Sequence, residues 1–265
     1  MAKKPKISII ITTYNNKDTI EACLKSIRGQ NFKNFELIVV DESSKDGTQQ
    51  VAKKYSNKFI NQGKERCQKR NIGAENAKAD YLFFVDSDMQ LSKNMLEEIS
   101  KKLDPKTLLM VPEISFGKGF WAKCKAFERA MYIRGDIAQG VRVYPKKIFF
   151  REKGFDENMV GVEDLDLFYR IKKHNKMKVK EIKNVLYHNE GKLTYKQIMK
   201  RINYYAKSFN KYKKRHPEMF KKQLSIKRYL KKWKYFVKHP LLAAGFIFIK
   251  GTEAFIVFHN MRKYH

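Results

Sequence analysis

Short apolar runs alternate with helical patterns along the first third of the chain, and this alternation is the strongest constraint on the fold. Runs rich in Ile, Val and Phe stand at residues 7–12, 36–41 and 81–85, and helical spacing occupies residues 18–29, 44–55 and 65–78. The first two runs are almost continuously apolar, which is typical of central strands in a parallel sheet covered by helices on both faces. The sequence therefore predicts an α/β fold with a mostly parallel sheet.

Polar residues follow each of these runs, at the point where the strand ends. Thr13, Tyr14 and Asn15 follow the first run, Asp41 closes the second, and Asp86-Ser87-Asp88 follows the third. In such sheets, ligands bind outside the carboxyl ends of the strands. We therefore expect these residues to gather at one ligand site.

The size and charge of the chain limit its class and its partners. With 265 residues, of which 43% are hydrophobic, the chain can bury a core, so disorder of the whole chain is excluded. A formal net charge of +30 indicates partners with negative charge, which are nucleic acid, anionic lipid headgroups or phosphorylated substrates.

The cysteines and the N-terminus indicate a reducing compartment. Cys23, Cys67 and Cys124 are far apart and form no CxxC pair, which argues against a zinc ribbon or a disulfide scaffold. The apolar run at residues 7–11 is too short for the core of a signal peptide. We expect a protein that is not secreted and that stays in the cytoplasm.

The composition changes after about residue 192. Residues 192–238 hold 17 Lys and Arg against a single acid, Glu218, and an apolar stripe recurs at helical spacing at Ile198, Ile202, Tyr205, Phe209 and Tyr212. A second helical pattern covers residues 226–237. We expect a catalytic domain at residues 1–192, and a C-terminal extension of basic amphipathic helices at residues 193–265.

This extension predicts contact with an anionic membrane surface. Basic helices with aromatic residues on the apolar side are typical of interfacial proteins. The apolar tail at residues 241–258 is interrupted by Lys250 and Glu253, which favours an interfacial or re-entrant segment over a clean span. The alternative is that the stripes pack on the catalytic core and that the lysines form a solvated face.

Asp86 and Asp88 flank one residue at a strand end, so extended geometry would place both carboxylates on the same side. Their repulsion, about 1 to 4 kcal/mol, would be relieved by a cation. Oxygen ligands favour Mg²⁺ or Mn²⁺, and such ions complete their shell with substrate phosphates. The alternative is a solvated turn.

Taken together, four motifs in order resemble those of the family 2 glycosyltransferases. The resemblance spans about residues 7–190, and its motifs are IIITTYN at 9–15, LIVVDESSKDGT at 37–48, KRNIG at 69–73 with ADYLFFVDSD at 79–88, and GFDE at 154–157 with ED at 163–164. It implies a GT-A fold (Rossmann-like, with helices flanking the sheet), a nucleotide-diphospho-sugar donor, a divalent metal and inversion at the anomeric carbon. A uridine donor is favoured by this resemblance alone.

The resemblance also implies roles for residues in these motifs. The nucleotide-sugar would be bound by Thr13, Tyr14, Asp41, Arg70 and Asp86, and the metal by Asp88 with Asp86. The alternatives are that Asp41 and Asp46 only form turns around Gly47, and that Arg70 pairs with a surface acid.

The catalytic pair and a third metal ligand come from the later motifs. Asp164 resembles the base that takes the acceptor proton, with Glu163 beside it, and His188 resembles a late metal-binding histidine. The alternatives are a helix-capping role for Asp164 and a structural role for His188. Residues 138–147 depart from the family pattern on the acceptor side, where Gln139 and Arg142 are candidate sugar or phosphate contacts.

These observations predict a metal-dependent inverting glycosyltransferase on the cytoplasmic face of the membrane. Its acceptor would be a hydroxyl or phosphate, lipid-linked because of the basic helices, or a glycan. One alternative is nucleotidyl transfer onto a sugar phosphate, although no glycine-rich phosphate loop follows the first strand. The other is a nucleic-acid-binding protein, which would leave the acidic residues unexplained because acids repel phosphates. We therefore expect no nucleic-acid partner.

Overall fold

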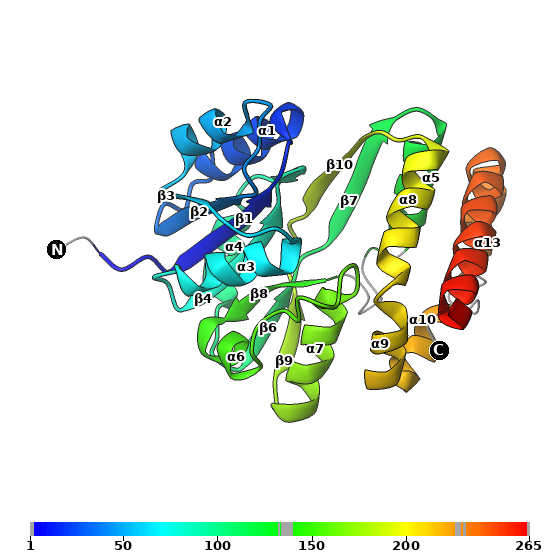
Figure 1. Cartoon of the computed structure of the whole chain (residues 1–265). Coiled ribbons are helices and arrows are strands. Elements are labelled where there is room, and N and C mark those ends of the chain that lie inside the picture. The colour runs from blue at the N-terminus through cyan, green and yellow to red at the C-terminus, as the bar shows by residue number, and fades with distance from the viewer. Residues whose placement is uncertain (1–2, 132, 134–139, 226–228, 230–231, 264–265) are drawn as a thin grey trace.

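The predicted strands assemble into a central sheet in the computed structural model, which describes residues 3–131, 133, 140–225, 229 and 232–263 (Figure 1). The sheet has the order β3-β2-β1-β4-β8-β6-β9. Its strands are β1 (Ile7–Thr13), β2 (Phe35–Asp41), β3 (Lys58–Asn61), β4 (Tyr81–Asp86), β6 (Thr107–Met110), β8 (Val141–Pro145) and β9 (Lys178–Glu181). The β3-β2-β1-β4 half is parallel, and β8 runs antiparallel to both neighbours. The mostly parallel α/β fold is confirmed.

Helices cover both faces of this sheet, as the continuously apolar strands predicted. Alternate residues of β1 enter different cores: Ile9 and Ile11 pack with α1, α2 and α4, and Ile10 packs with α3, α6 and α7. These helices are α1 (Lys17–Arg28), α2 (Thr48–Tyr55), α3 (Arg66–Glu75), α4 (Met95–Lys102), α6 (Lys146–Arg151) and α7 (Glu163–His174). All of β1 is buried, so its carboxyl end is rigidly held.

A second, small sheet stands beside the carboxyl end of β4. It has the order β5-β10-β7, with β5 (Met89–Leu91), β7 (Glu113–Lys118) and β10 (Leu186–Lys192). His188 lies within β10, where it pairs with Met89 and Ser115. The small sheet therefore brings His188 to the segment that follows β4.

The C-terminal helices stand together with α5 on one side of the molecule (Figure 1). They are α8 (Tyr195–Ala206), α9 (Phe209–Arg215), α10 (Pro217–Leu224), α12 (Trp233–Lys238) and α13 (Pro240–Lys263), and α5 spans Phe120–Ala130. A capping box between Thr194 and Gln197 starts α8. Ala122 of α5, Ile198 of α8 and Ile249 of α13 share a small apolar core. The helical extension is confirmed, and the boundary at residue 192 stays a prediction.

The apolar stripe at residues 198–212 packs on the protein itself. Ile198 is buried against α5, and Tyr212 is buried with Met159 and Val162 beside α7. This is the alternative in which the stripe packs on the core. In the second pattern, Ile226 and Leu230 lie outside the described residues, whereas Trp233 and Val237 are exposed.

The apolar tail is one continuous helix, α13, despite Lys250 and Glu253. In the described part of the chain, Pro240–Asn260 is the one helix that is long and apolar enough to cross a membrane, by length and composition only. The three cysteines are free and buried.

Candidate functional site

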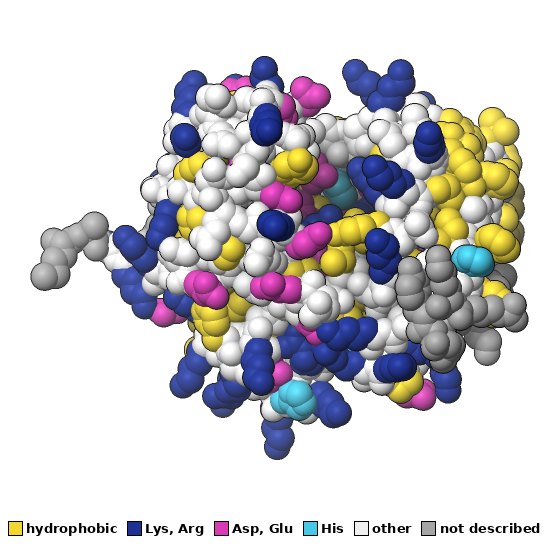
Figure 2. All heavy atoms as spheres, viewed as in Figure 1, with side chains coloured by type: hydrophobic (Ala, Val, Ile, Leu, Met, Phe, Trp, Pro, Cys, Tyr) yellow, Lys and Arg dark blue, Asp and Glu magenta, His cyan; other side chains and the backbone are white. Residues whose placement is uncertain are grey.

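A cavity of about 720 Å³ opens between the α/β part and the C-terminal helices. Most of the residues that the sequence singled out line it: Thr13, Tyr14, Asp86, Asp88, Glu163, Asp164 and His188. Figure 2 shows acidic and basic side chains gathered around this hollow. Asp41 and Arg70 are buried behind the lining and do not contribute to it.

The sheet order places the first residues of the site. β1 and β4 are adjacent parallel strands, with Thr12 opposite Asp86, and the chain turns in opposite directions from them. Such a switch point is where open α/β sheets bind ligands. Thr13 is buried at the end of β1 and its Oγ1 has no hydrogen-bond partner within the described residues. Tyr14 is 52% exposed, with Lys69 Nζ 5.9 Å from its ring centre.

Asp41 is held in a turn. Its Oδ1 accepts a hydrogen bond from the Ser44 backbone N–H at 2.7 Å, and its Oδ2 accepts one from the Ser44 hydroxyl at 2.6 Å. Asp46 likewise accepts from the backbone and side chain of Thr48. These hydrogen bonds agree with the alternative in which Asp41 and Asp46 form turns around Gly47. A contact between Asp41 and a nucleotide base stays a prediction.

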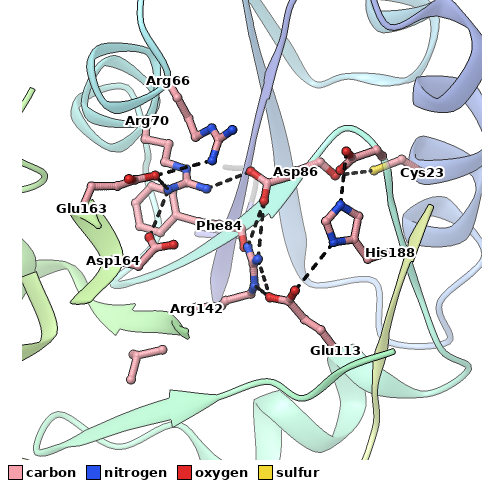
Figure 3. A network of polar contacts seen from close by, with 12 residues as sticks. Cys23, Arg66, Arg70, Phe84, Asp86, Glu113, Arg142, Glu163, Asp164 and His188 are labelled. Atoms are coloured by element: carbon pink, nitrogen blue, oxygen red, sulfur yellow. Dashed lines mark hydrogen bonds and ion pairs between the residues drawn. The ribbon is translucent and has the colours of Figure 1, made fainter. Parts of the chain in front are cut away.

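Arg70 connects the donor side of the cavity with the candidate catalytic pair (Figure 3). Its Nη2 donates to Asp86 Oδ1 at 2.8 Å, and its Nη1 donates to Asp164 Oδ1 at 3.0 Å and Glu163 Oε1 at 3.2 Å. The side chain is 2% exposed. The partners of Arg70 are therefore buried or cavity acids, and the alternative in which Arg70 pairs with a surface acid is wrong.

Arg142 holds the other oxygen of Asp86. It lies 3.4 Å from Asp86 Oδ2 and donates through Nε to Glu113 Oε1 at 2.8 Å. Burial alone would raise the pKa of Asp86, but the guanidinium groups of Arg70 and Arg142 hold that pKa well below its usual range. These charges favour the ionised form of Asp86, and Arg142 contacts the carboxylates of Asp86 and Glu113 as well as the carbonyl oxygen of Phe84, at 3.4 Å. Gln139 lies outside the described residues.

Glu113 is a site residue that the sequence reasoning missed. It lies on β7 and contacts Arg142, Arg129 and, at 3.8 Å, His188 Nδ1. A lone Glu in a six-residue strand carries no sequence signal. Its importance comes from the pairing of β7 with β10, which joins residues more than 70 positions apart.

Asp88 and His188 are the pair whose chemistry fits a divalent metal. His188 Nε2 lies 3.3 Å from Asp88 Oδ2, while Asp88 Oδ1 is buried with no hydrogen-bond partner among the described residues. Such an oxygen is free to bind a cation. No cluster of three or more ligating side chains is present in the described residues, so further ligands would come from substrate oxygens. Both oxygens of Asp86 face arginines, and its assignment to the metal stays a prediction.

Glu163 and Asp164 begin α7. The residue before the helix is Val162 and no side chain caps it, so Asp164 is not a capping residue. Burial raises the pKa of Asp164, Arg70 opposes this, and the neighbouring Glu163 charge raises the pKa further. A carboxylate whose pKa is raised is a better proton acceptor, as a general base requires.

The chain matches the family model "Glycosyl transferase family 2" over residues 8–159. Among curated relatives, a GalNAc(5)-diNAcBac-PP-undecaprenol beta-1,3-glucosyltransferase of Campylobacter jejuni is 31% identical over 106 residues, which cover 37% of this chain and 34% of the relative. The matched segments span between 15% and 58% of the curated relatives' own lengths.

Two solved structures share the fold at 16% identity. Staphylococcus aureus TarS 1-349 in complex with UDP-GlcNAc has a TM-score of 0.55, covering 98% of this chain and 91% of that one. The mannosyltransferase PcManGT of Pyrobaculum calidifontis, in complex with GDP-Man and Mn²⁺, has a TM-score of 0.58, covering 98% and 74%. The GT-A fold that the family resemblance implied is confirmed.

Proposed function

Because the chain belongs to glycosyl transferase family 2, we propose that it transfers a sugar from a nucleotide-diphospho-sugar to an acceptor, with inversion and with a divalent metal. One observation supports this proposal above the others. A single buried arginine, Arg70, joins the anion at the end of β4 to the two carboxylates at the start of α7. These three acids resemble the family's donor and catalytic motifs, and they line one cavity.

The donor would lie at the carboxyl ends of β1 and β4. The exposed Tyr14 ring and the unpaired Thr13 hydroxyl are suited to contact the nucleoside. Asp88 and His188 would hold Mn²⁺ or Mg²⁺, which supplies charge stabilisation for the leaving diphosphate. A uridine donor is favoured by the family resemblance and by the UDP-GlcNAc complex of the TarS neighbour.

The chemistry of the chain's own residues is a proton transfer. In an inverting displacement, the acceptor hydroxyl loses its proton as its oxygen attacks the sugar, and the Asp164 carboxylate would take that proton. Arg70 orients the carboxylate through Asp164 Oδ1. Burial and the charge of the neighbouring Glu163, which is 2% exposed, raise the pKa of Asp164.

The acceptor that we propose is lipid-linked and lies at an anionic membrane surface. The relative from C. jejuni is named for an undecaprenol-linked substrate. In this chain, the cavity extends to α8 and α13, and the exposed Arg201 of α8 lines it beside Ile198 and Ile202. This mixture of cationic and apolar side chains suits the phosphate and the first isoprenes of such a lipid.

Two substitutions separate the proposed roles. Asp164→Asn keeps the shape of the side chain but removes the base, so we expect sugar transfer to fall by about 10² to 10⁴ while donor binding is nearly unchanged. Asp88→Ala should weaken metal-dependent donor binding itself. Transfer is measured with a radiolabelled UDP-sugar, and binding by titration calorimetry with and without Mn²⁺.

Lys101→Ala is the control, because this exposed residue of α4 pairs with Glu97 and should leave both readouts unchanged. Turnover at the normal rate in Asp164→Asn would remove Asp164 from the base role. Unchanged metal-dependent binding in Asp88→Ala would remove Asp88 from the metal.

A further inference from the structure

The last helix, α13, has its polarity inverted relative to a helix at a water-exposed surface. From residue 241 to residue 255, every exposed position carries Leu, Ala, Ile, Phe or Gly. Leu241, Ile247, Phe248 and Phe255 are between 56% and 77% exposed. Figure 2 shows hydrophobic side chains gathered along the edge where Figure 1 places α13. In water, the outward face of a helix is normally the polar one.

The charged residues of the same segment face the protein. Lys250 Nζ contacts Glu128 of α5 at 2.5 Å and Glu253 at 2.6 Å, and the Lys250 side chain is 25% exposed. Burial alone would lower the pKa of Lys250, but the Glu128 and Glu253 charges raise it, so the lysine stays charged. Lys250 and Glu253, which interrupt the apolar tail in the sequence, therefore form ion pairs on the inner side of α13.

Close packing fixes which face of α13 points outward. A Cβ at Gly245 would come within 2.5 Å of Cys124 Sγ and 2.7 Å of a Phe120 ring atom, so the backbone of α13 packs directly against side chains of α5. Further along, Tyr195 of α8 bonds to Thr252 at 2.9 Å, and Asn260 bonds to Asn203 at 3.1 Å. Rotation of α13 would break these contacts, so the apolar face is a fixed surface.

We propose that this outward face of α13 lies in the acyl-chain region of one membrane leaflet, with the helix axis along the membrane plane. Between residues 241 and 255 the outward face has no polar side chain and the charges point inward, and hydrocarbon is the environment that suits such a face. Cations and an aromatic residue stand just before α13: Lys234 and Lys238 are exposed beside the exposed Trp233. Anionic headgroups and their interface with the acyl chains suit these side chains.

The in-plane orientation follows from the neighbour of α13. α8 runs alongside it and exposes Lys196, Lys200 and Arg201. If α13 crossed the bilayer, these cations would sit at hydrocarbon depth, which is strongly unfavourable. With the axis in the plane, only the outward side chains enter the acyl region.

The inner side of the same helix lines the catalytic cavity. Lys250 and Glu253 belong to the cavity wall that also includes Asp88, His188 and Asp164. A lipid-anchored acceptor could then reach the cavity while its chain stays in the bilayer. The access of a lipid-anchored acceptor rests on the proposed function, whereas the lipid contact of α13 is independent of that function.

Depth-dependent quenching tests the contact on the full chain. Phe248→Cys and Phe255→Cys are labelled with bimane and mixed with vesicles of phosphatidylcholine and phosphatidylglycerol, with or without bromine on the acyl chains. The parent protein is the blank, because its three cysteines are buried. We expect brominated lipid to remove about half or more of the fluorescence at both positions, and to do so in about 1 M salt, because apolar insertion is not screened.

Lys101→Cys is the matched control, since its side chain is 71% exposed on α4 and it should not be quenched. A second variant, Phe248→Glu with Phe255→Glu, should raise the lipid concentration needed for flotation by about tenfold or more. Phe150→Glu, which alters an aromatic residue of similar size on α6, should not.

Two results would overturn the proposal. Binding that high salt abolishes, with no quenching at residues 248 and 255, would assign membrane contact to the lysines alone. A dimer in sedimentation equilibrium without vesicles, with both labels already shielded, would make a second copy the occupant. A nucleotide-dependent rise in unfolding temperature, measured on the same labelled proteins, reports on the proposed function separately.

Discussion

Two buried arginines neutralise the acidic side chains of the site. Arg70 and Arg142 each contact one oxygen of Asp86, and each also contacts a further acid, Asp164 or Glu113. Buried charges are tolerated only when they are paired in this way. These ion pairs hold the carboxylates of Asp86 and Asp164 in place before any substrate binds, so the site is pre-organised.

The raised pKa of Asp164 predicts the pH dependence of transfer. A general base acts when deprotonated, so kcat/KM should fall as the pH falls through this raised pKa, above the ordinary value of 3.8. Glu163→Gln removes a neighbouring negative charge, which lowers the pKa of Asp164 and should move the acidic limb to lower pH. The measurement is kcat/KM from about pH 4 to pH 8 in both proteins.

The control for this profile is Asp18→Asn, an exposed acid at the start of α1 that should leave the limb in place. An acidic limb that stays at the same pH in Glu163→Gln would mean that Asp164 is not the titrating base.

Gly73 allows α3, which carries Arg70, to approach the sheet. A Cβ there would come within 2.4 Å of Ile10 Cγ2 in the core. Gly73→Ala should therefore lower the free energy of unfolding by about 1 to 3 kcal/mol, measured by urea denaturation. In Gly251→Ala nothing lies within 4 Å of the added Cβ, and the helix propensity of Ala should stabilise the protein by about 0.5 to 1 kcal/mol. Equal effects of the two substitutions would contradict the close packing.

Among the elements, the segment that leads into β10 is held by Glu98 of α4 together with Ser92. Glu98 of α4 accepts hydrogen bonds from the backbone N–H groups of Lys183 and Asn184, at 2.7 and 2.9 Å, just before β10 begins. Burial alone would raise the pKa of Glu98, but the hydrogen bonds from Lys102, Lys183 and Asn184 lower it to about 2. The carboxylate therefore stabilises the folded state.

Glu98→Ala should lower the free energy of unfolding at neutral pH by about 2 kcal/mol, measured by urea denaturation. Because the folded pKa is depressed, this stabilisation is complete above the ordinary value of 4.5 and is lost as the pH falls towards about 2. The difference between the two proteins should shrink over that range. Glu97→Ala removes an exposed pair with Lys101 and should cost at most about 0.5 kcal/mol at any pH. A Glu98 effect that is constant with pH would contradict its charged role.

The elements that could be predicted from the sequence are those whose hydrophobic pattern is local. The buried β1, β2 and β4 have long apolar runs, and each was predicted to within one residue. The helix expected at 44–55 begins only at Thr48, because Ser44 turns back to Asp41 and Gly47 has a φ of +96°. The edge strand β3 has four residues, partly exposed, and its pattern was too weak to predict.

In the molecule as a whole, the cavity lies between the α/β part and the C-terminal helices, which the sequence pattern predicted as two separate regions. The motif residues were predictable because they follow strands, but their pairing through Arg70 and Glu113 depends on contacts between distant strands and helices. The membrane contact was predicted for the amphipathic stripe at 198–212, yet that stripe packs on the protein. Periodicity identifies an apolar face, but only the packing of α8 on α5 shows what covers it.

We propose a metal-dependent nucleotide-sugar site at the carboxyl ends of β1 and β4. Thermal unfolding with UDP, GDP and ADP, each with and without Mn²⁺, tests it most directly, because a ligand at about 100 times its Kd adds roughly 2.7 kcal/mol to the folded state. We expect a rise in the unfolding temperature with UDP that requires Mn²⁺. No rise with any of the three nucleotides, in protein shown to be folded, would contradict it.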